Sequence, residues 1–374
     1  MTGSTIDLSK TKESSRNPFA SSKNEAQYLE RGSEYPDLVY PAHPDSVQEG
    51  FEYLHTARSD LRPSRGERLA NTNPMRRMDM PIRAMGSMIK IMRDIQKGSS
   101  QSWEDIEPYF DELEAAPFEP KPGLWDELNK MVGKKWDDVR LGFTELPQQM
   151  IFRGKFTLFR YALVVSQEMK KDRIDYAPAF QAGQEVMRVY GSLGLVVNEV
   201  ARWLRKHGVR CQSNHPMGGL TNTPSLAGKA GMGWQGHSGI LVTPEYGPRV
   251  RLALVFIEHK IFEFTDNREH DWIEEYCELC KLCEKACPGQ AINREKTVTI
   301  NNVPGVGAMR TCIDRESCFE YFNKTMGCSV CVKVCPFSNG GDAYNRLKRN
   351  CSKEGELRTL NTKSGDSITL KKKK

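Results

Sequence analysis

Cysteine spacing constrains this 374-residue chain more than any other feature, because seven of its eleven cysteines fall in two short runs. The first run places Cys277, Cys280, Cys283 and Cys287 directly before Pro288. This is the C-x2-C-x2-C-x3-C-P spacing of bacterial ferredoxins, whose first three thiolates cap one [4Fe–4S] cubane while the fourth ligates another. The spacing therefore predicts a second ligand set elsewhere in the chain.

That second set lies about forty residues further on, where Cys328, Cys331 and Cys335 precede Pro336. Crossed ligation gives the first cluster Cys277, Cys280, Cys283 and Cys335, and the second cluster Cys287, Cys318, Cys328 and Cys331. Cys312 competes with Cys318 for the last place. We favour Cys318 because it precedes a helical-looking segment, FEYFNKTMG, that leads into the second run.

Zinc is the alternative occupant, because C-x2-C pairs also bind zinc. Zinc motifs rarely combine x2 spacing with an x3-C-P ending, and that ending occurs twice here. The pattern therefore favours two [4Fe–4S] clusters and one-electron transfer. Of the remaining cysteines, Cys211 is expected to be a buried thiol and Cys351 a thiol in the tail.

Composition indicates a globular protein, with 38% hydrophobic and 27% charged residues. No apolar run approaches the roughly 18–20 residues of a membrane span, and the polar N-terminus lacks a secretory signal. We therefore expect a cytoplasmic location, where cysteines more often bind metal than form disulfides. The net charge of +6 comes partly from Lys371–Lys374, and the sequence shows no recognisable nucleic-acid-binding motif.

Residue patterns divide the chain into four regions. We expect a polar extension over 1–70, an α/β domain over 71–270, a double-cluster domain over 271–345 and a polar, disordered tail over 346–374. Within the α/β domain, apolar spacing from Pro81 predicts a helix that ends at Gly98. A longer helix is predicted over 182–207, closed by Gly208. Strands are predicted over 138–144, 161–167, 239–243 and 250–257, so the fold class is α/β (α+β).

A glycine-rich loop precedes the last two predicted strands. It carries Gly231, Gly233, Gly236 and Gly239, which permit the backbone to approach a large flat ligand closely. The order is loop and then strand, the reverse of a dinucleotide fingerprint, so a nicotinamide site is disfavoured.

This loop (AG-x-G-x-x-G-x-x-G), the turn EYGPRVR and the paired cysteine runs together resemble the corrinoid-dependent reductive dehalogenases and their relative, epoxyqueuosine reductase. The resemblance covers roughly residues 135–340. It implies a nitroreductase-like corrinoid-binding core with a C-terminal ferredoxin-like double [4Fe–4S] module. It also implies a cobalamin held base-off, which fits the absence of a D-x-H-x-x-G motif. The corrinoid-binding residues expected from it are Gly231, Gly233, Gly236, Ser238, Gly239 and Thr243.

The resemblance also implies two catalytic residues. Tyr190, on the long predicted helix, matches the tyrosine that donates a proton to carbon, although it could equally be a packed core aromatic. His237 stands where the family often has arginine and is expected to assist Tyr190. Trp234 leans toward epoxyqueuosine reductase, whereas Asp175-Tyr176-Ala177 departs from that enzyme's Asp-Tyr-His motif.

The leading functional hypothesis is therefore reductive dehalogenation of an organohalide, with electrons from an external low-potential donor such as ferredoxin or flavodoxin. The first alternative is an epoxyqueuosine-like reductase of a tRNA base, the one case in which a nucleic acid partner is expected. The second alternative is a non-catalytic iron–sulfur electron-transfer protein.

Overall fold

A four-stranded sheet forms the centre of the computed structural model, which describes residues 22–49, 84–110, 118–325, 327–351, 359–361 and 367–369. Its strand order is β2-β4-β8-β5, and every neighbouring pair is antiparallel. The strands are β2 (Val139–Glu145), β4 (Tyr161–Glu168), β5 (Cys211–Asn214) and β8 (Val250–Ile257). Three of the four predicted strands are thus confirmed, whereas only Leu241–Val242 (β7) of predicted strand 239–243 is a strand.

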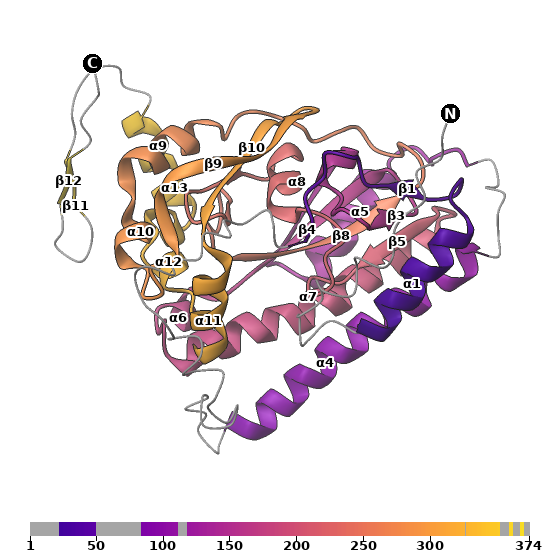
Figure 1. Ribbon diagram of the computed structural model, residues 1–374, viewed down its shortest axis with the longest axis horizontal. Coiled ribbons are helices and arrows are strands. Elements are labelled where there is room, and N and C mark those ends of the chain that lie inside the picture. The colour runs from indigo at the N-terminus through magenta and orange to yellow at the C-terminus, as the bar shows by residue number, and fades with distance from the viewer. Residues whose placement is uncertain are drawn as a thin grey trace.

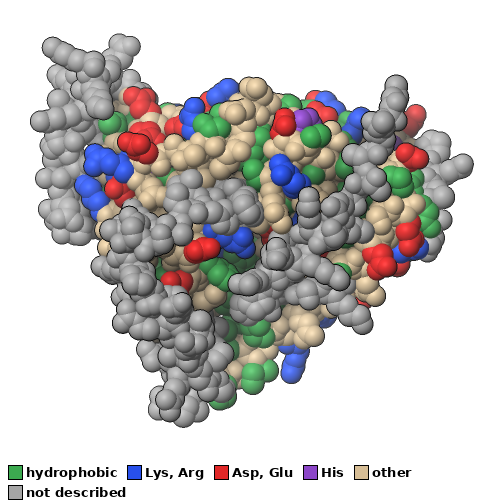
Figure 2. All heavy atoms as spheres, viewed as in Figure 1, with side chains coloured by type: hydrophobic (Ala, Val, Ile, Leu, Met, Phe, Trp, Pro, Cys, Tyr) green, Lys and Arg blue, Asp and Glu red, His purple; other side chains and the backbone are tan. Residues whose placement is uncertain are grey.

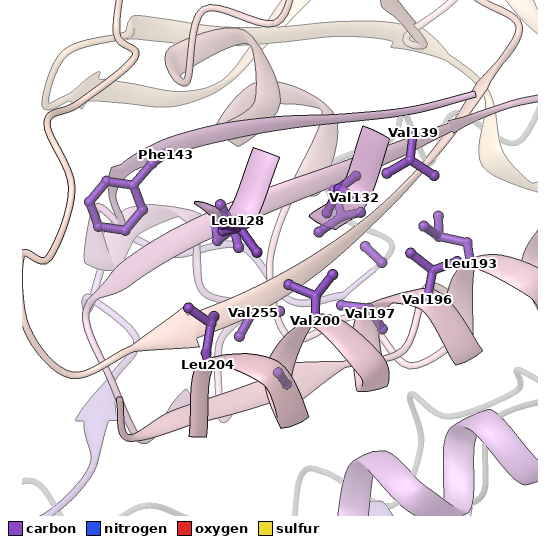
Figure 3. Close-up of a cluster of buried hydrophobic side chains, with 14 of the residues drawn as sticks. Leu128, Val132, Val139, Phe143, Leu193, Val196, Val197, Val200, Leu204 and Val255 are labelled. Carbon is purple, nitrogen blue, oxygen red and sulfur yellow. The ribbon is translucent and has the colours of Figure 1, made fainter. Parts of the chain in front are cut away.

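Two helices cover one face of the sheet: α5 (Leu124–Lys135) and α7 (Phe180–Lys206). Figure 3 shows Leu128 and Val132 of α5 and Val196, Val197, Val200 and Leu204 of α7 beside Val255 of β8. The long helix agrees with the prediction, and Gly208, with φ of +81°, follows it in the left-handed conformation.

The opposite face is covered by α8 (Thr223–Lys229), α1 (Ser22–Glu34) and the hairpin of β9 (Ile292–Val303) and β10 (Gly307–Ile313). Helix α1 was not predicted, because the 1–70 region was expected to lack a long periodic segment. Its Tyr28 is 4% exposed and stacks on Phe156 with ring centroids 4.4 Å apart. The predicted polar extension therefore contributes to the core.

Helix α4 (Met85–Glu104) lies against α7, as Figure 1 shows. The predicted helix end at Gly98 is wrong, because α4 continues for six residues beyond it. The carbonyl of Gly98 accepts a hydrogen bond from Asn198 Nδ2 on α7 at 2.8 Å. A Cβ at Gly98 would lie 3.1 Å from the ring of His215. Glycine there lets the two helices approach and does not end the helix.

The cysteine-bearing segments gather at one end of the molecule, near the N-terminal end of α7 (Figure 1). Lys333 Nζ donates to the carbonyl of Ala177 just before α7, at 3.0 Å. The helices here are α9 (Trp272–Cys280), α10 (Leu282–Ala286), α11 (Arg315–Thr325), α12 (Val330–Lys333) and α13 (Gly341–Cys351). The predicted boundary at residue 346 falls inside α13, so Cys351 ends a helix.

The remaining elements are short. They are β1 (Tyr40–Pro41), η3 (Glu107–Phe110), η4 (Gln148–Met150), β3 (Phe156–Thr157), α6 (Lys171–Ile174), β6 (Trp234–Gln235), η5 (Pro336–Asn339), β11 (Thr359–Asn361) and β12 (Ser367–Thr369). Within the described helices, no stretch has the length and apolarity of a membrane span. Figure 2 shows acidic and basic side chains intermixed over the visible face. The fold is mixed, as predicted, with an antiparallel sheet at its centre.

Candidate functional site

The first cysteine site is a small cavity where α9, α10 and η5 meet. Its lining includes all four cysteines of the predicted first cluster: Cys277, Cys280, Cys283 and Cys335. Burial raises the pKa of Cys277 to about 11 and that of Cys283 to about 12. Thiolates are stable in such an enclosure when a positively charged centre binds them. The donor set and its enclosure therefore fit an iron–sulfur cluster.

The second cysteine site lies around Cys331, on α12. Burial, then the neighbouring Cys318, Cys283, Cys328 and Cys287 sulfurs, hold the pKa of this thiol well above its ordinary value. Cys318 itself interacts electrostatically with Cys287 and Cys328. Among the described residues, no three His, Cys, Asp or Glu side chains stand close enough to bind a single metal ion. The four cysteines predicted for the second cluster are nevertheless neighbours.

Cys312, the competitor of Cys318, is placed elsewhere. It is 2% exposed, and its Sγ donates to the carbonyl of His237 at 2.9 Å. It packs with Ile292 and Ile313, against which Cys283, Cys287 and Cys331 also lie. The structure thus puts Cys318, and not Cys312, beside Cys287 and Cys328.

His237, predicted to assist Tyr190, contacts the first cysteine site instead. Its ring lies 3.1 Å from Lys281 Nζ through Nδ1 and 3.0 Å from the carbonyl of Asn293 through Nε2. Burial and then the Lys281 charge lower the pKa of His237 to about 4, so the ring is neutral near pH 7. A contact with Tyr190 is not among those found in the described residues.

The cation placed against Tyr190 is Arg251, on β8. Its guanidinium carbon lies 4.9 Å from the centroid of the half-buried Tyr190 ring. Arg251 also interacts electrostatically with Cys318, and its buried Nε has no hydrogen-bond partner among the described residues. Arg251 therefore connects Tyr190 to the second cysteine site.

A second unpartnered polar atom lies on the same side of α7. His215 Nδ1 accepts from the backbone N–H of Met217 at 3.1 Å, whereas its buried Nε2 has no partner in the described part of the chain. A Cβ at Gly194, one turn after Tyr190, would meet this Nε2 at 2.1 Å. His215 Nε2 is thus enclosed between α7 and α4, whereas the unpartnered Arg251 Nε lies beside Tyr190, and such a buried donor is a feature expected of a cofactor site.

The glycine-rich loop is explained by contacts within the protein. A Cβ at Gly231 would meet the carbonyl of Thr265 at 2.3 Å, and one at Gly233 would meet that of Val242 at 2.1 Å. A Cβ at Gly236 would lie 3.6 Å from Cys277 Sγ, and one at Gly239 would lie 3.1 Å from the side chain of Ile313. Ser238 lines the first cysteine site, and Thr243 Oγ1 donates to the carbonyl of Gly247. Of these residues, Gly236 and Ser238 line the cysteine site, and the predicted corrinoid contacts of all six stay predictions.

A larger cavity of about 530 Å³ adjoins the first cysteine site across Gly236, which lines both. Its basic side chains are paired: Lys229 with Asp266 at 2.8 Å and Lys296 with Glu274 at 3.4 Å. The charges on its walls therefore largely offset each other.

Comparison with known proteins agrees with this arrangement. The 4Fe-4S binding domain model matches residues 270–293. A tetrachloroethene reductive dehalogenase of Desulfitobacterium hafniense is 30% identical over 195 residues, covering 49% of this chain and 34% of the relative. An epoxyqueuosine reductase of Listeria monocytogenes is 32% identical over 137 residues, covering 36% of this chain and 34% of that relative. The chain is thus similar in sequence to the reductive dehalogenases and to the epoxyqueuosine reductases.

The chain spans about a third of the length of these curated relatives. Among solved structures, a catabolic reductive dehalogenase in complex with 3-bromo-4-hydroxybenzoic acid matches with a TM-score of 0.48 at 20% identity, covering 57% of this chain and 32% of that one. The sequence resemblance of the present chain to both enzyme groups is confirmed, and the matched 4Fe-4S binding domain supports a [4Fe–4S] cluster.

Three residues near these sites were missed by the sequence analysis. Arg251 was visible in the PRVR segment, and its place on a strand facing the long helix could have suggested a partner for Tyr190. Lys281 lies between Cys280 and Cys283, a position that gives no sign of its side-chain contacts. His215 was not singled out, because its surroundings, Ser213-Asn214-His215-Pro216, do not match the D-x-H-x-x-G motif. Their importance comes from contacts between distant segments.

Proposed function

We propose that this chain is a corrinoid- and iron–sulfur-dependent reductase that replaces the halogen of an organohalide with hydrogen. The reaction consumes two electrons and one proton and releases a halide ion. The observation that carries the proposal is the line from the second cysteine site through Arg251 to Tyr190. In this proposal, a proton-donating group stands beside the end of an electron path.

The eight cysteines of the two sites would hold two [4Fe–4S] clusters and pass single electrons from an external low-potential donor such as ferredoxin or flavodoxin. A bound corrinoid would supply a strongly reducing cobalt centre for cleavage of the carbon–halogen bond. Among the described residues, Arg251 Nε is the unpartnered donor that would face a ligand beside Tyr190. We propose this reaction for the cytoplasm, where such donors are found.

Tyr190 would then deliver the proton to the substrate carbon. A phenol that gives up its proton becomes an anion, and the guanidinium of Arg251 over the ring stabilises that charge. We therefore give Arg251 the assisting role that the sequence suggested for His237. In this assignment His237 belongs to the first cysteine site.

Reduction of a modified tRNA base is the second candidate, favoured by the 32% identity to an epoxyqueuosine reductase. A third candidate, an electron carrier without a corrinoid, shares the cysteine sites but needs no proton donor at Tyr190.

Anaerobic reconstitution with iron, sulfide and cobalamin separates the three. A dehalogenase should bind about eight irons and one cobalamin, give a Co(II) EPR signal without nitrogen splitting, and release halide with a chemical reductant. Halide release that does not depend on cobalamin contradicts the proposal. Turnover of an epoxyqueuosine-containing tRNA stem loop without halide release supports the second candidate, and cluster absorption alone supports the third.

A further inference from the structure

The turn between β6 and β7 passes beside the first cysteine site and brings His237 into its wall. We propose that His237 is a positioning residue: it fixes the ammonium group of Lys281 beside Cys277, Cys280, Cys283 and Cys335, and this charge raises the reduction potential of the cluster bound there. The inference rests on the proposed function only in requiring clusters at the two cysteine sites. It does not depend on a corrinoid or on dehalogenation.

Hydrogen bonds define the orientation of the His237 ring. Nε2 lies 3.0 Å from the carbonyl of Asn293, which can only accept, so Nε2 carries the proton. Nδ1 is then an acceptor, and it faces Lys281 Nζ at 3.1 Å. The tautomer follows from the two partners. The buried imidazole thus accepts from the lysine on one side and donates to the backbone on the other.

The ammonium group of Lys281 has three hydrogen-bond partners, one for each of its N–H donors. Besides His237, Nζ donates to Glu278 Oε2 at 2.8 Å and to the carbonyl of Arg294 at 3.0 Å. The side chain is 11% exposed, whereas that of Glu278 is 46% exposed. Lysine side chains usually extend into water, so three fixed partners are needed to retain the charge inside.

The position of Lys281 along the chain ties this charge to the first site. It lies between Cys280 and Cys283, with a positive φ of 50°, and lines the same cavity as the four cysteines and His237. The backbone N–H of His237 also donates to Cys277, and Cys312 Sγ donates to the His237 carbonyl. The turn is therefore held against both the lysine and a ligand sulfur.

The sign of the effect follows from electrostatics. A cluster gains negative charge when it is reduced, so a nearby positive charge favours the reduced state. Solvent screens a buried charge weakly, and the exposed Glu278 offsets only part of it. With an effective dielectric constant of about 20 and a separation of about 10 Å, the ratio of reduced to oxidised cluster changes about tenfold. For a one-electron couple this corresponds to about 59 mV.

The second cysteine site provides an internal reference. Asp314 and Arg251 are the charged groups that act on its Cys318, and neither His237 nor Lys281 is among the groups that act on Cys318 or Cys331. Cys331 also lines the cavity that holds Lys281, so a change at Lys281 should move the potential of the first cluster more than that of the second.

The test is an EPR-monitored redox titration of the full chain, reconstituted with iron and sulfide but without corrinoid. Lys281→Met should lower one of the two midpoint potentials by about 59 mV, the equivalent of a tenfold change in the ratio of reduced to oxidised cluster. His237→Leu should lower the same potential, because it removes the acceptor for Lys281. His237→Gln should restore the parent value, because its amide oxygen can accept from Lys281 and its amide N–H can donate to Asn293. The control is Lys260→Met, because Lys260 is exposed, pairs with Glu263 at 3.1 Å and is not among the charges that act on Cys277, Cys280 or Cys283.

Each contrary outcome has a separate meaning. If Lys281→Met leaves both potentials unchanged, or shifts both equally, the inference is wrong. If His237→Gln behaves like His237→Leu, the histidine acts through packing and not through its acceptor. Should His237→Leu fail to fold, Lys281→Met still decides. Iron content distinguishes the two levels: a parent protein without about eight irons contradicts the proposed function, whereas a fully loaded parent with unshifted variants contradicts this inference alone.

Discussion

Tyr190 shows how a single residue acquires its role from its neighbours. It packs against core residues of α7 and α4, as any half-buried aromatic does, and it also receives Arg251 on its ring face. Packing alone would be preserved by phenylalanine, whereas proton donation requires the hydroxyl.

Tyr190→Phe should therefore reduce halide release by about 10²- to 10⁴-fold, the usual contribution of general acid catalysis. Thermal stability, iron content and cobalamin content should match the parent, because the ring remains. Steady-state rates with a chemical reductant provide the measurement. Parent-like turnover would show that Tyr190 is only a core aromatic.

His215 makes a second prediction at the residue scale. Burial lowers its pKa to about 4, whereas an unfolded chain exposes it with a pKa near 6.5. The unfolded state thus takes up the proton first, and stability falls as the pH falls from 6.5 toward 4, by up to about 3 kcal/mol.

Denaturant unfolding between pH 5 and 7 measures this dependence. His215→Asn keeps an acceptor for the Met217 N–H but cannot titrate, so its stability should depend less on pH. The remaining slope comes from other groups, including His237, whose pKa burial also lowers to about 4. An unchanged slope in the variant would contradict the assignment.

At the scale of elements, the sequence predicted what depends on local pattern. The apolar runs at 161–167 and 250–257 are the central strands because they are buried on both faces of the sheet. Gly98 was misinterpreted because its contact partners, Asn198 and His215, lie about a hundred residues away. Helix α1 was missed because its short apolar stripe becomes meaningful only against Phe156. The grouping of seven cysteines into two runs was visible in their spacing, whereas the partner of Tyr190 depended on the register of β8.

Helix α1 is fixed to the core by a buried ion network. Lys155 Nζ lies 2.7 Å from both Glu25 and Glu49 and 3.0 Å from the carbonyl of Gly219. Its side chain is 8% exposed. Lys155→Met leaves two carboxylates without their cation and should destabilise the fold by about 3–5 kcal/mol.

Lys121→Met is the matched control, since Lys121 pairs with Glu127 at the surface, with 67% and 44% of the side chains exposed. Such pairs contribute about 0–1 kcal/mol. Urea unfolding of both variants provides the comparison. Equal losses would mean that the Lys155 network adds nothing to the stability of α1.

At the scale of the whole molecule, the two cysteine runs are interleaved. Cys335, from the second run, lines the first site, and Cys287, from the first run, neighbours Cys318, Cys328 and Cys331. Neither site can be completed by one run alone.

Crossed ligation predicts which substitutions behave alike. Cys287→Ser should impair the same cluster as Cys328→Ser, and Cys335→Ser the same cluster as Cys277→Ser, despite their positions in the chain. EPR redox titration of the four variants should sort them into these two pairs. Sorting by sequence run, with Cys287→Ser resembling Cys277→Ser, would contradict the assignment.

The hairpin of β9 and β10 lies between the two runs, and this has a consequence for biosynthesis. While the ribosome is still producing the hairpin, the nascent chain already contains four cysteines in ferredoxin spacing but has only three ligands for one site and one for the other. Both sites gain their last ligands within a few residues of each other, at Cys331 and Cys335. For two crossed clusters, we therefore expect metal loading to be a late event that completes both centres together, after the polypeptide has folded back on itself.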